Sequence, residues 1–183
     1  MKINNTSVSS GIHAARVPSS GGAIYPFVRT YSANATQVLN ANVLRCFPFY
    51  PINTFTITGF TINVQVSAST AVLRVLFFDD LGGRPYNKLY ESTNIDATST
   101  GNKLISQSYT FVGGVPYWIS IHSSATPSIL STSYLACYGF QFNSLPANVS
   151  NCFIFTYAIG SVPSTLPIGT SSTFNTFLIS LNL

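Results

Sequence analysis

Residues 74–92 read RVLFFDDLGGRPYNKLYES, and this stretch carries the clearest structural pattern in the chain. An apolar run leads into two aspartates, a Gly-Gly pair and a proline, after which polar and apolar residues alternate. Asp79 and Asp80 favour the start of a turn because their side chains accept hydrogen bonds from nearby backbone N–H groups, and the glycines supply positive φ. Pro85 has no N–H to donate and so suits an open sheet edge. The stretch therefore predicts a strand, a turn and a second strand that returns Leu89 to the core.

The composition of the 183-residue chain predicts a β-protein with a neutral polar surface. Hydrophobic residues make up 46% of the chain, aromatic residues 14% and charged residues only 7%. Ordinary soluble domains carry about 25% charged residues, and here Ser, Thr and Asn fill the gap. Disordered chains are poor in aromatic residues and rich in charge, so we expect a folded domain. A surface with so little charge has weak electrostatic protection against association, which favours contact between subunits.

The charge pattern also excludes some classes of partner. The eight basic and four acidic residues give a net charge of +4, and the basic residues are scattered from Lys2 to Lys103. Nucleic-acid binding depends on clustered Lys and Arg side chains, so we expect no nucleic-acid partner. The N-terminal residues show no secretory signal, and no run reaches the ~18 apolar residues of a membrane span. We therefore expect synthesis in the cytosol and no membrane insertion.

The three cysteines, Cys46, Cys137 and Cys152, are an odd number and show no zinc-ligand spacing. An odd number argues against a complete disulfide framework. We expect all three to be small buried hydrophobic residues.

From Ala23 onward, short apolar or alternating segments follow one another, separated by Gly, Pro, Ser and Asn. The segments that read as strands are 54–67, 71–78, 115–124, 134–142, 152–160 and 173–183, and 34–44 favours a strand over a short helix. Gly59 interrupts the first alternation, which predicts a bulge or a bend. About eight to ten strands suit a jelly-roll-like antiparallel β-sandwich. We expect one all-β domain over residues 23–183, preceded by an extended N-terminal arm over residues 1–22.

The alternation also predicts which side chains share a face of a strand. In 71–78, one face holds Leu73, Val75 and Phe77. In 115–124, one face holds Tyr117, Ile119 and Ile121, and the other holds Trp118, Ser120 and His122.

All four acidic residues lie in or just after the opening stretch: Asp79, Asp80, Glu91 and Asp96. Glycoside hydrolysis needs two carboxyl groups that face one space, whereas adjacent residues of a strand point to opposite faces. His13 lies in the predicted arm, and His122 lies on a strand with no charged neighbour in the sequence. No nucleophile motif accompanies them. We therefore expect no enzymatic activity and no cofactor.

Calcium binding is a second interpretation of the two aspartates. Asp79, Asp80 and the carbonyl groups of the turn are oxygen ligands of the kind that calcium prefers. The stretch lacks the D-x-D-x-D ladder of an EF-hand loop. The turn remains the simpler interpretation, and calcium at Asp79 and Asp80 stays an alternative to it.

A family resemblance follows from three quoted segments. FPFYPINTFTITGFTINV, LRVLFFDDLGGRPYNKLYES and GNKLISQSYTFVGGVPYWISIHSS together resemble a β-sandwich module of tailed-bacteriophage virion proteins, over about residues 45–123. The sequence departs from that family in having FFDD where one aromatic and one polar residue are usual. The resemblance implies a jelly-roll-like module of a capsid decoration, head-fibre or tail-fibre protein, often trimeric.

The function expected from these observations is structural. We expect a capsid decoration or head-fibre subunit that is made in the host cytoplasm, docks through its arm, with His13 and Arg16 as candidate contacts, and forms a homo-oligomer, with a trimer favoured. Its partners would be capsid or tail proteins of the same virion. The alternative is a receptor- or carbohydrate-binding module of a tail fibre that contacts a host surface glycan. The candidate glycan contacts are Trp118, Tyr86 and Tyr90, with Tyr117 beside them, although a lone Trp in a strand usually belongs to the core.

Overall fold

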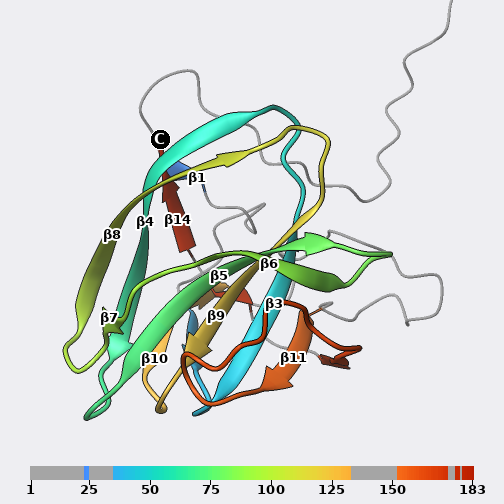
Figure 1. Ribbon diagram of the computed structural model, residues 1–183. Coiled ribbons are helices and arrows are strands. Elements are labelled where there is room, and N and C mark those ends of the chain that lie inside the picture. Colours follow the sequence, from blue (N-terminus) through green and yellow to red (C-terminus); the bar gives the residue numbers. More distant parts are fainter. Residues whose placement is uncertain (1–22, 25–34, 133–151, 173–175, 178) are drawn as a thin grey trace, which may run out of the picture.

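The computed structural model describes residues 23–24, 35–132, 152–172, 176–177 and 179–183 (Figure 1). Some predicted features lie outside these residues, namely the N-terminal arm with His13 and Arg16, the segment 134–142, and Cys137. In the described ranges the chain forms strands, turns and bends. No helix in that part of the chain is long and apolar enough to cross a bilayer.

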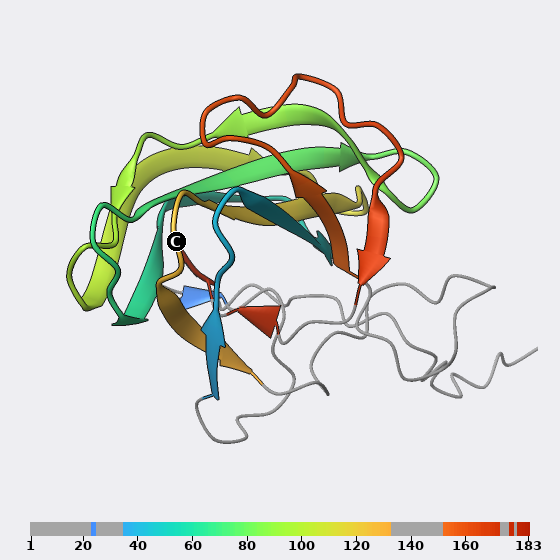
Figure 2. The same ribbon diagram turned by 90° about the horizontal axis from the view of Figure 1, so that it is seen from below.

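The strands form two antiparallel sheets (Figures 1 and 2). The β4 sheet runs in the order β1 (Ala23–Ile24), β14 (Ile179–Asn182), β4 (Phe55–Val66), β10 (Ser128–Thr132) and β13 (Thr176–Phe177), with β2 (Ala35–Val38) beside β10 and β8 (Gly101–Phe111) beside β4. The β5 sheet runs in the order β12 (Thr170–Ser172), β11 (Cys152–Thr156), β3 (Val43–Phe49), β9 (Tyr117–Ser123), β5 (Val72–Asp80) and β6 (Pro85–Glu91), with β7 (Ile95–Asp96) beside β5. This confirms the predicted all-β antiparallel sandwich.

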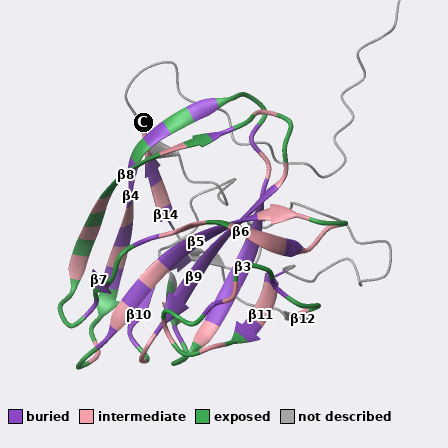
Figure 3. Ribbon diagram, viewed as in Figure 1, coloured by how far each residue is buried: buried purple, intermediate pink, exposed green. Residues whose placement is uncertain are grey.

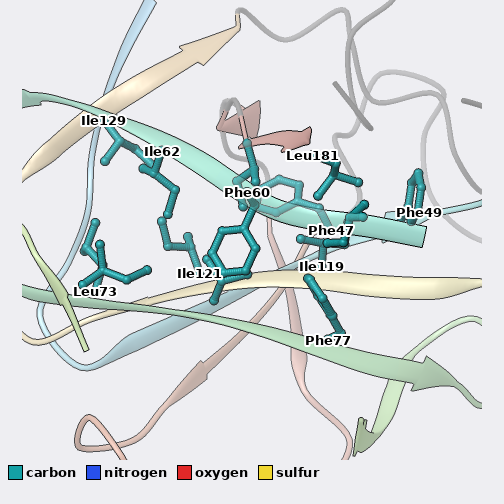
Figure 4. Packing of buried hydrophobic residues seen from close by; sticks show 14 of the residues in the cluster. Phe47, Phe49, Phe60, Ile62, Leu73, Phe77, Ile119, Ile121, Ile129 and Leu181 are labelled. Atoms are coloured by element: carbon teal, nitrogen blue, oxygen red, sulfur yellow. The ribbon is translucent and has the colours of Figure 1, made fainter. Parts of the chain in front are cut away.

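One hydrophobic core fills the space between the sheets (Figure 4). The β4 sheet contributes Phe60 and Ile62, and the β5 sheet contributes Phe77 and Ile119, all without exposed surface. Two of the predicted faces belong to this core: Leu73, Val75 and Phe77 from β5, and Tyr117, Ile119 and Ile121 from β9. The period-2 alternation therefore predicted correctly which side chains share a face of each strand, and the structure shows that these faces point inward.

Gly59 marks the predicted irregularity in β4. Pairing of β4 with β8 shifts register between Ile57 and Gly59, and the buried side of the strand resumes at Phe60. A Cβ at position 59 would lie 2.3 Å from the carbonyl oxygen of Ile105, so only glycine fits this close approach of the two backbones. Beyond the bulge, Ile62 and Val64 are buried but Val66 is 56% exposed, so the buried side of β4 ends at Val64.

The outer face of the β5 sheet is covered by residues 157–169, which connect β11 to β12 and are called the strap below (Figure 2). Val162 and Leu166 of the strap belong to a second hydrophobic cluster with side chains from four strands, Leu44, Cys46, Leu76, Phe78, Trp118 and Phe155. Burial of each strap side chain contributes about 1.5–3 kcal/mol. The centre of the β5 sheet is therefore buried on both faces. Figure 3 shows β5 and β9 as mostly buried, whereas β8 of the other sheet alternates between intermediate and exposed residues.

The strap also pairs with the outer edge of β6. The Lys88 N–H donates to the Ser164 carbonyl over 2.7 Å, and the Leu166 N–H donates to the Tyr86 carbonyl over 2.9 Å. The open edge expected beside Pro85 is therefore occupied. Such a cover protects an edge strand against pairing with other chains.

The expectation that Leu89 returns to the core is wrong, since its side chain is 43% exposed. Pairing of β5 with β6 shifts register between Phe77 and Phe78 and again before Asp80. These shifts turn Tyr90 inward instead, and its ring lies 4.9 Å from that of Phe77. A one-residue slip in a strand exchanges its two faces.

Candidate functional site

The two aspartates build the turn that joins β5 to β6. Asp79 accepts hydrogen bonds from the Asn87 backbone N–H (2.6 Å) and side-chain amide (2.9 Å). Asp80 accepts one from the Gly83 N–H (3.0 Å) and one from the Trp118 indole N–H (2.8 Å). Gly82 and Gly83 have φ of 64° and 83°, as the turn chemistry predicts. The predicted turn is confirmed, and both oxygens of each carboxylate accept a hydrogen bond, one of them from Trp118 on β9.

The hydrogen bonds of the turn also affect whether Asp79 and Asp80 could bind calcium. Calcium takes 6–8 oxygen ligands, and the carboxylate oxygens of Asp79 and Asp80 already accept protein hydrogen bonds. Among the described residues, no three His, Cys, Asp or Glu side chains form a group suited to a metal ion. Asp96 is bonded within its own loop to Thr98, which lowers the pKa of its carboxyl group. A calcium ion at Asp79 and Asp80 would therefore have to share the carboxylate oxygens with these protein donors.

Glu91 is the one carboxylate of the region that sits between two cations. Its Oε1 lies 2.7 Å from Arg74 Nη1, and its Oε2 lies 2.7 Å from Lys88 Nζ. Burial raises the pKa of Glu91, but hydrogen bonds and charges from Lys88 and Arg74 outweigh it, so the net pKa lies below its ordinary value. Lys88 also donates to the Val162 carbonyl over 2.8 Å. The cluster is an ionised pair network that ties β6 to β5 and to the strap.

His122 lies beneath the strap and has no exposed surface. Its Nε2 is 2.9 Å from the carbonyl oxygen of Tyr157, and because a carbonyl only accepts, Nε2 carries the proton. Desolvation lowers the pKa of His122, against the opposing effects of the Tyr157 carbonyl and of Glu91. The imidazole is therefore a neutral, buried group that holds the beginning of the strap.

The candidate glycan contacts divide into buried and half-buried side chains. Trp118 is 0% exposed, so a sugar has no access to its ring, and the glycan role proposed for it is replaced by packing under the strap. Tyr117 is 5% exposed and accepts a hydrogen bond from Val112 N–H. Tyr90 packs against Phe77 in the core.

Tyr86 differs from these aromatic residues. It is half-buried on β6, and the guanidinium carbon of Arg84 lies 5.3 Å from the centre of its ring. An aromatic ring beside a cation and next to an exposed turn can contact a polar ligand. Of the candidate aromatic contacts, Tyr86 is the one that keeps accessible surface at a loop.

A feature that the sequence reasoning missed lies on the outer side of the β4 sheet. Outward positions of β4, β8 and β14 carry hydroxyl and amide side chains around one leucine, here called the uncharged face: Thr56, Thr58, Thr61, Asn63, Gln65, Asn102, Leu104, Ser106, Ser108, Thr110, Ser180 and Asn182. The alternation of residues 101–111 could be read from the sequence, but nothing in the sequence showed that this segment pairs with β4. Strand pairing alone shows that these residues share one surface.

Side chains of the uncharged face are linked across the strands. Thr56 and Thr110 share a hydroxyl hydrogen bond of 2.8 Å. Farther along, Asn63 donates to Asn102 over 2.6 Å, and on the other side of β4, Asn182 donates to Thr61 over 3.2 Å. Cross-strand pairs of this kind stabilise a sheet by about 0.2–1 kcal/mol each, and they hold the polar groups in one arrangement.

Leu104 is the large apolar side chain of this face and is 68% exposed. It lies on β8 opposite Thr61 and between the exposed Asn102 and Ser106. An apolar centre within a polar rim is the usual anatomy of a protein interface.

No protein-family model matches the chain, and no curated protein matches it in a sequence search.

Proposed function

We propose that this protein is a non-enzymatic structural subunit of a bacteriophage virion, a capsid decoration or head-fibre protein that assembles as a homo-oligomer, with a trimer favoured. The observation that carries the proposal is the uncharged face, a sheet surface of hydroxyl and amide groups around an exposed Leu104. Burial of neutral polar and apolar surface is the means by which subunits of an assembly hold together.

The roles of the ionisable groups agree with this proposal. Asp79 and Asp80 accept hydrogen bonds that shape a turn, Glu91 is held between two cations, and His122 is buried beneath the strap. Each of these groups therefore stabilises the sandwich. The resemblance of residues 45–123 to virion modules supports the same class of protein.

Quantitative mass spectrometry of purified particles tests the proposal. The particles come from the phage whose genome encodes the chain, and we expect the protein to be present at a copy number that matches the capsid lattice. A copy number that matches the tail would move the proposal to a tail-fibre role. Absence from the particles would refute a virion role.

We further propose that the N-terminal arm docks the sandwich on the capsid. The arm carries His13 and Arg16, whose imidazole and guanidinium groups can bond to acidic and carbonyl groups of a neighbouring protein. A variant with His13→Ala and Arg16→Glu should lose binding to particles that lack the protein. Arg84→Glu, in the β5–β6 turn, is the matched control and should bind normally; equal binding of both variants would refute docking by the arm.

The second candidate function is recognition of a surface glycan, and Tyr86 beside Arg84 is the observation that favours it. Sugar rings stack on aromatic faces, so Tyr86→Ser should abolish binding on a glycan array, whereas Tyr86→Phe should retain it. If the wild-type protein binds no glycan on the array, the second candidate function is refuted and only the structural role remains.

A further inference from the structure

We infer that the uncharged face is the surface through which one copy of this chain binds a second copy. The inference deepens the homo-oligomer of the proposed function and rests on it. It assigns a particular surface, formed by β4, β8 and β14, to the contact.

The first argument is charge. Except for Lys103, the charged side chains of the described residues lie on β3, β5, β6 and β7 and in the turn between β5 and β6. They are Arg45, Arg74, Asp79, Asp80, Arg84, Lys88, Glu91 and Asp96. Lys103 is on β8, but it pairs with the buried Ile62, so it lies on the opposite side of the strand from Leu104, and its Nζ donates to Ser99. A chain with a net charge of +4 repels its own copy. A surface free of charged side chains allows two copies to approach without placing like charges together.

The second argument is self-complementarity. Ser, Thr, Asn and Gln side chains carry both donors and acceptors. Where a patch lies at the symmetry axis of a homo-oligomer, it meets the same patch of the other copies, so a surface with both kinds of group can bond to its own copy, whereas a surface with charges of one sign cannot. The uncharged face consists of such residues around Leu104.

The third argument is that the side chains of this face are already restrained in the single chain. The cross-strand bonds Thr56–Thr110 and Asn63–Asn102 already restrain these side chains in the single chain. Association costs less when interface side chains lose little rotamer freedom. Leu104 lies between these two pairs along β8 and supplies the apolar centre that a contact between copies would bury.

Sedimentation equilibrium and light scattering of the full chain test the inference. We expect the wild-type chain to be oligomeric at micromolar concentration. Leu104→Glu brings the negative charges of neighbouring copies together at the contact and should weaken association on the order of tenfold or more. Ser106→Glu, at the next outward position of β8, should weaken it in the same direction and covers the case in which the first variant folds poorly.

Ile168→Glu is the matched control, because Ile168 is 82% exposed but lies on the strap, on the far side of the sandwich. It should leave the association constant unchanged, and thermal unfolding of all variants shows that each is folded. A monomeric wild type overturns the inference even if virion mass spectrometry succeeds. An oligomer that neither Leu104→Glu nor Ser106→Glu weakens shows that another surface joins the copies, while the homo-oligomer itself stands.

Discussion

Asp80 makes one hydrogen bond within its own turn and one to a strand that is distant in the sequence. One of its carboxylate oxygens closes the turn on Gly83, and the other accepts the indole N–H of Trp118, which is fully buried. The sequence neighbourhood explains the first bond, because an aspartate at a turn bonds the backbone a few residues on. The second depends on β5 and β9 being adjacent in the sheet, with Phe78 opposite Trp118. A residue that resembles an acid catalyst therefore serves as the polar partner of a core tryptophan.

Replacement of Asp80 tests this role. Asp80→Ala leaves the buried indole N–H without its acceptor, and we expect a loss of about 1–3 kcal/mol of unfolding free energy. Urea denaturation monitored by tryptophan fluorescence measures the change, and Trp118 is the only tryptophan of the chain. Thr100→Ala, at an exposed position, serves as the control and should stay within about 0.5 kcal/mol of the wild type. A loss no larger than that of the control would contradict the role given to Asp80.

Gly59 offers a second test at the scale of one residue. The added Cβ of Gly59→Ala would lie 2.3 Å from the Ile105 carbonyl oxygen, so β4 and β8 must separate. Overpacking of this kind costs about 1–3 kcal/mol. Chemical denaturation measures the loss, and the exposed neighbour Thr58→Ala is the control. A Gly59→Ala protein as stable as that control would mean that the bulge tolerates a side chain.

At the scale of the element, the strap turns one face of the β5 sheet into a second core. Val162 and Leu166 pack on this face, and its edge strand pairs with Ser164 and Leu166 through the backbone. Lys88 and His122 add bonds to the carbonyl groups of Val162 and Tyr157. The strap is therefore held by apolar packing and backbone pairing, together with one neutral imidazole and one ammonium group.

The stability of the protein should fall when His122 takes up a proton. Burial lowers the pKa of His122, so below the ordinary histidine pKa of about 6.5 the unfolded chain binds more protons than the folded one. The stabilising contribution of the neutral imidazole is complete above that value and is lost as the pH falls through the lowered pKa of the folded state. Denaturation midpoints between about pH 7.5 and about pH 5.5 should show the decline.

His122→Gln is the variant that isolates this effect. The amide can still donate to the Tyr157 carbonyl but does not titrate, so the decline in stability over this pH range should become shallower. Glu91 has a lowered pKa as well, and its contribution is lost only at more acidic pH, below the ordinary range of a glutamate. A decline of the same steepness in His122→Gln would assign the pH dependence to another group.

At the scale of the whole molecule, charge is distributed unevenly between the two sheets. The ion pairs of Glu91 with Arg74 and Lys88 lie on the β5 sheet, while the outer side of the β4 sheet is neutral in the part of the chain that the structure describes. The exposed side chains of the β4 sheet are hydroxyls and amides that bond to one another. The two sides of the sandwich therefore present different chemistry to a partner.

Association through the uncharged face should not weaken in salt. Salt screens interactions between exposed charges, and the Debye length falls from about 10 Å at 0.1 M to about 3 Å at 1 M. An interface without ion pairs loses nothing by this screening, and the repulsion between chains of net charge +4 becomes smaller. Sedimentation equilibrium at low and high sodium chloride should give association that is equal or stronger at high salt. A marked weakening would mean that charged groups join the copies.

The sequence by itself determined the features that depend on neighbouring residues. The period-2 alternation showed which side chains share a face of β5 and of β9, and the turn chemistry of residues 79–83 described the link from β5 to β6. The interruption at Gly59 predicted the bulge. Side-chain direction in a strand and hydrogen bonds in a tight turn are set within a few residues, so these features are readable from local order.

Only the tertiary structure decided what covers the outer faces. The strap comes back over β6 from residues about eighty positions later in the chain, as in the Thr165–Asn87 bond. Because the register of β6 shifts at two points, Tyr90 turned inward and Leu89 outward, against the prediction. The uncharged face joins β4, β8 and β14, which are distant in sequence and adjacent in the sheet. Pairing between distant strands depends on long-range packing, which no local pattern encodes, and so the shared surfaces appear only when the sheets are formed.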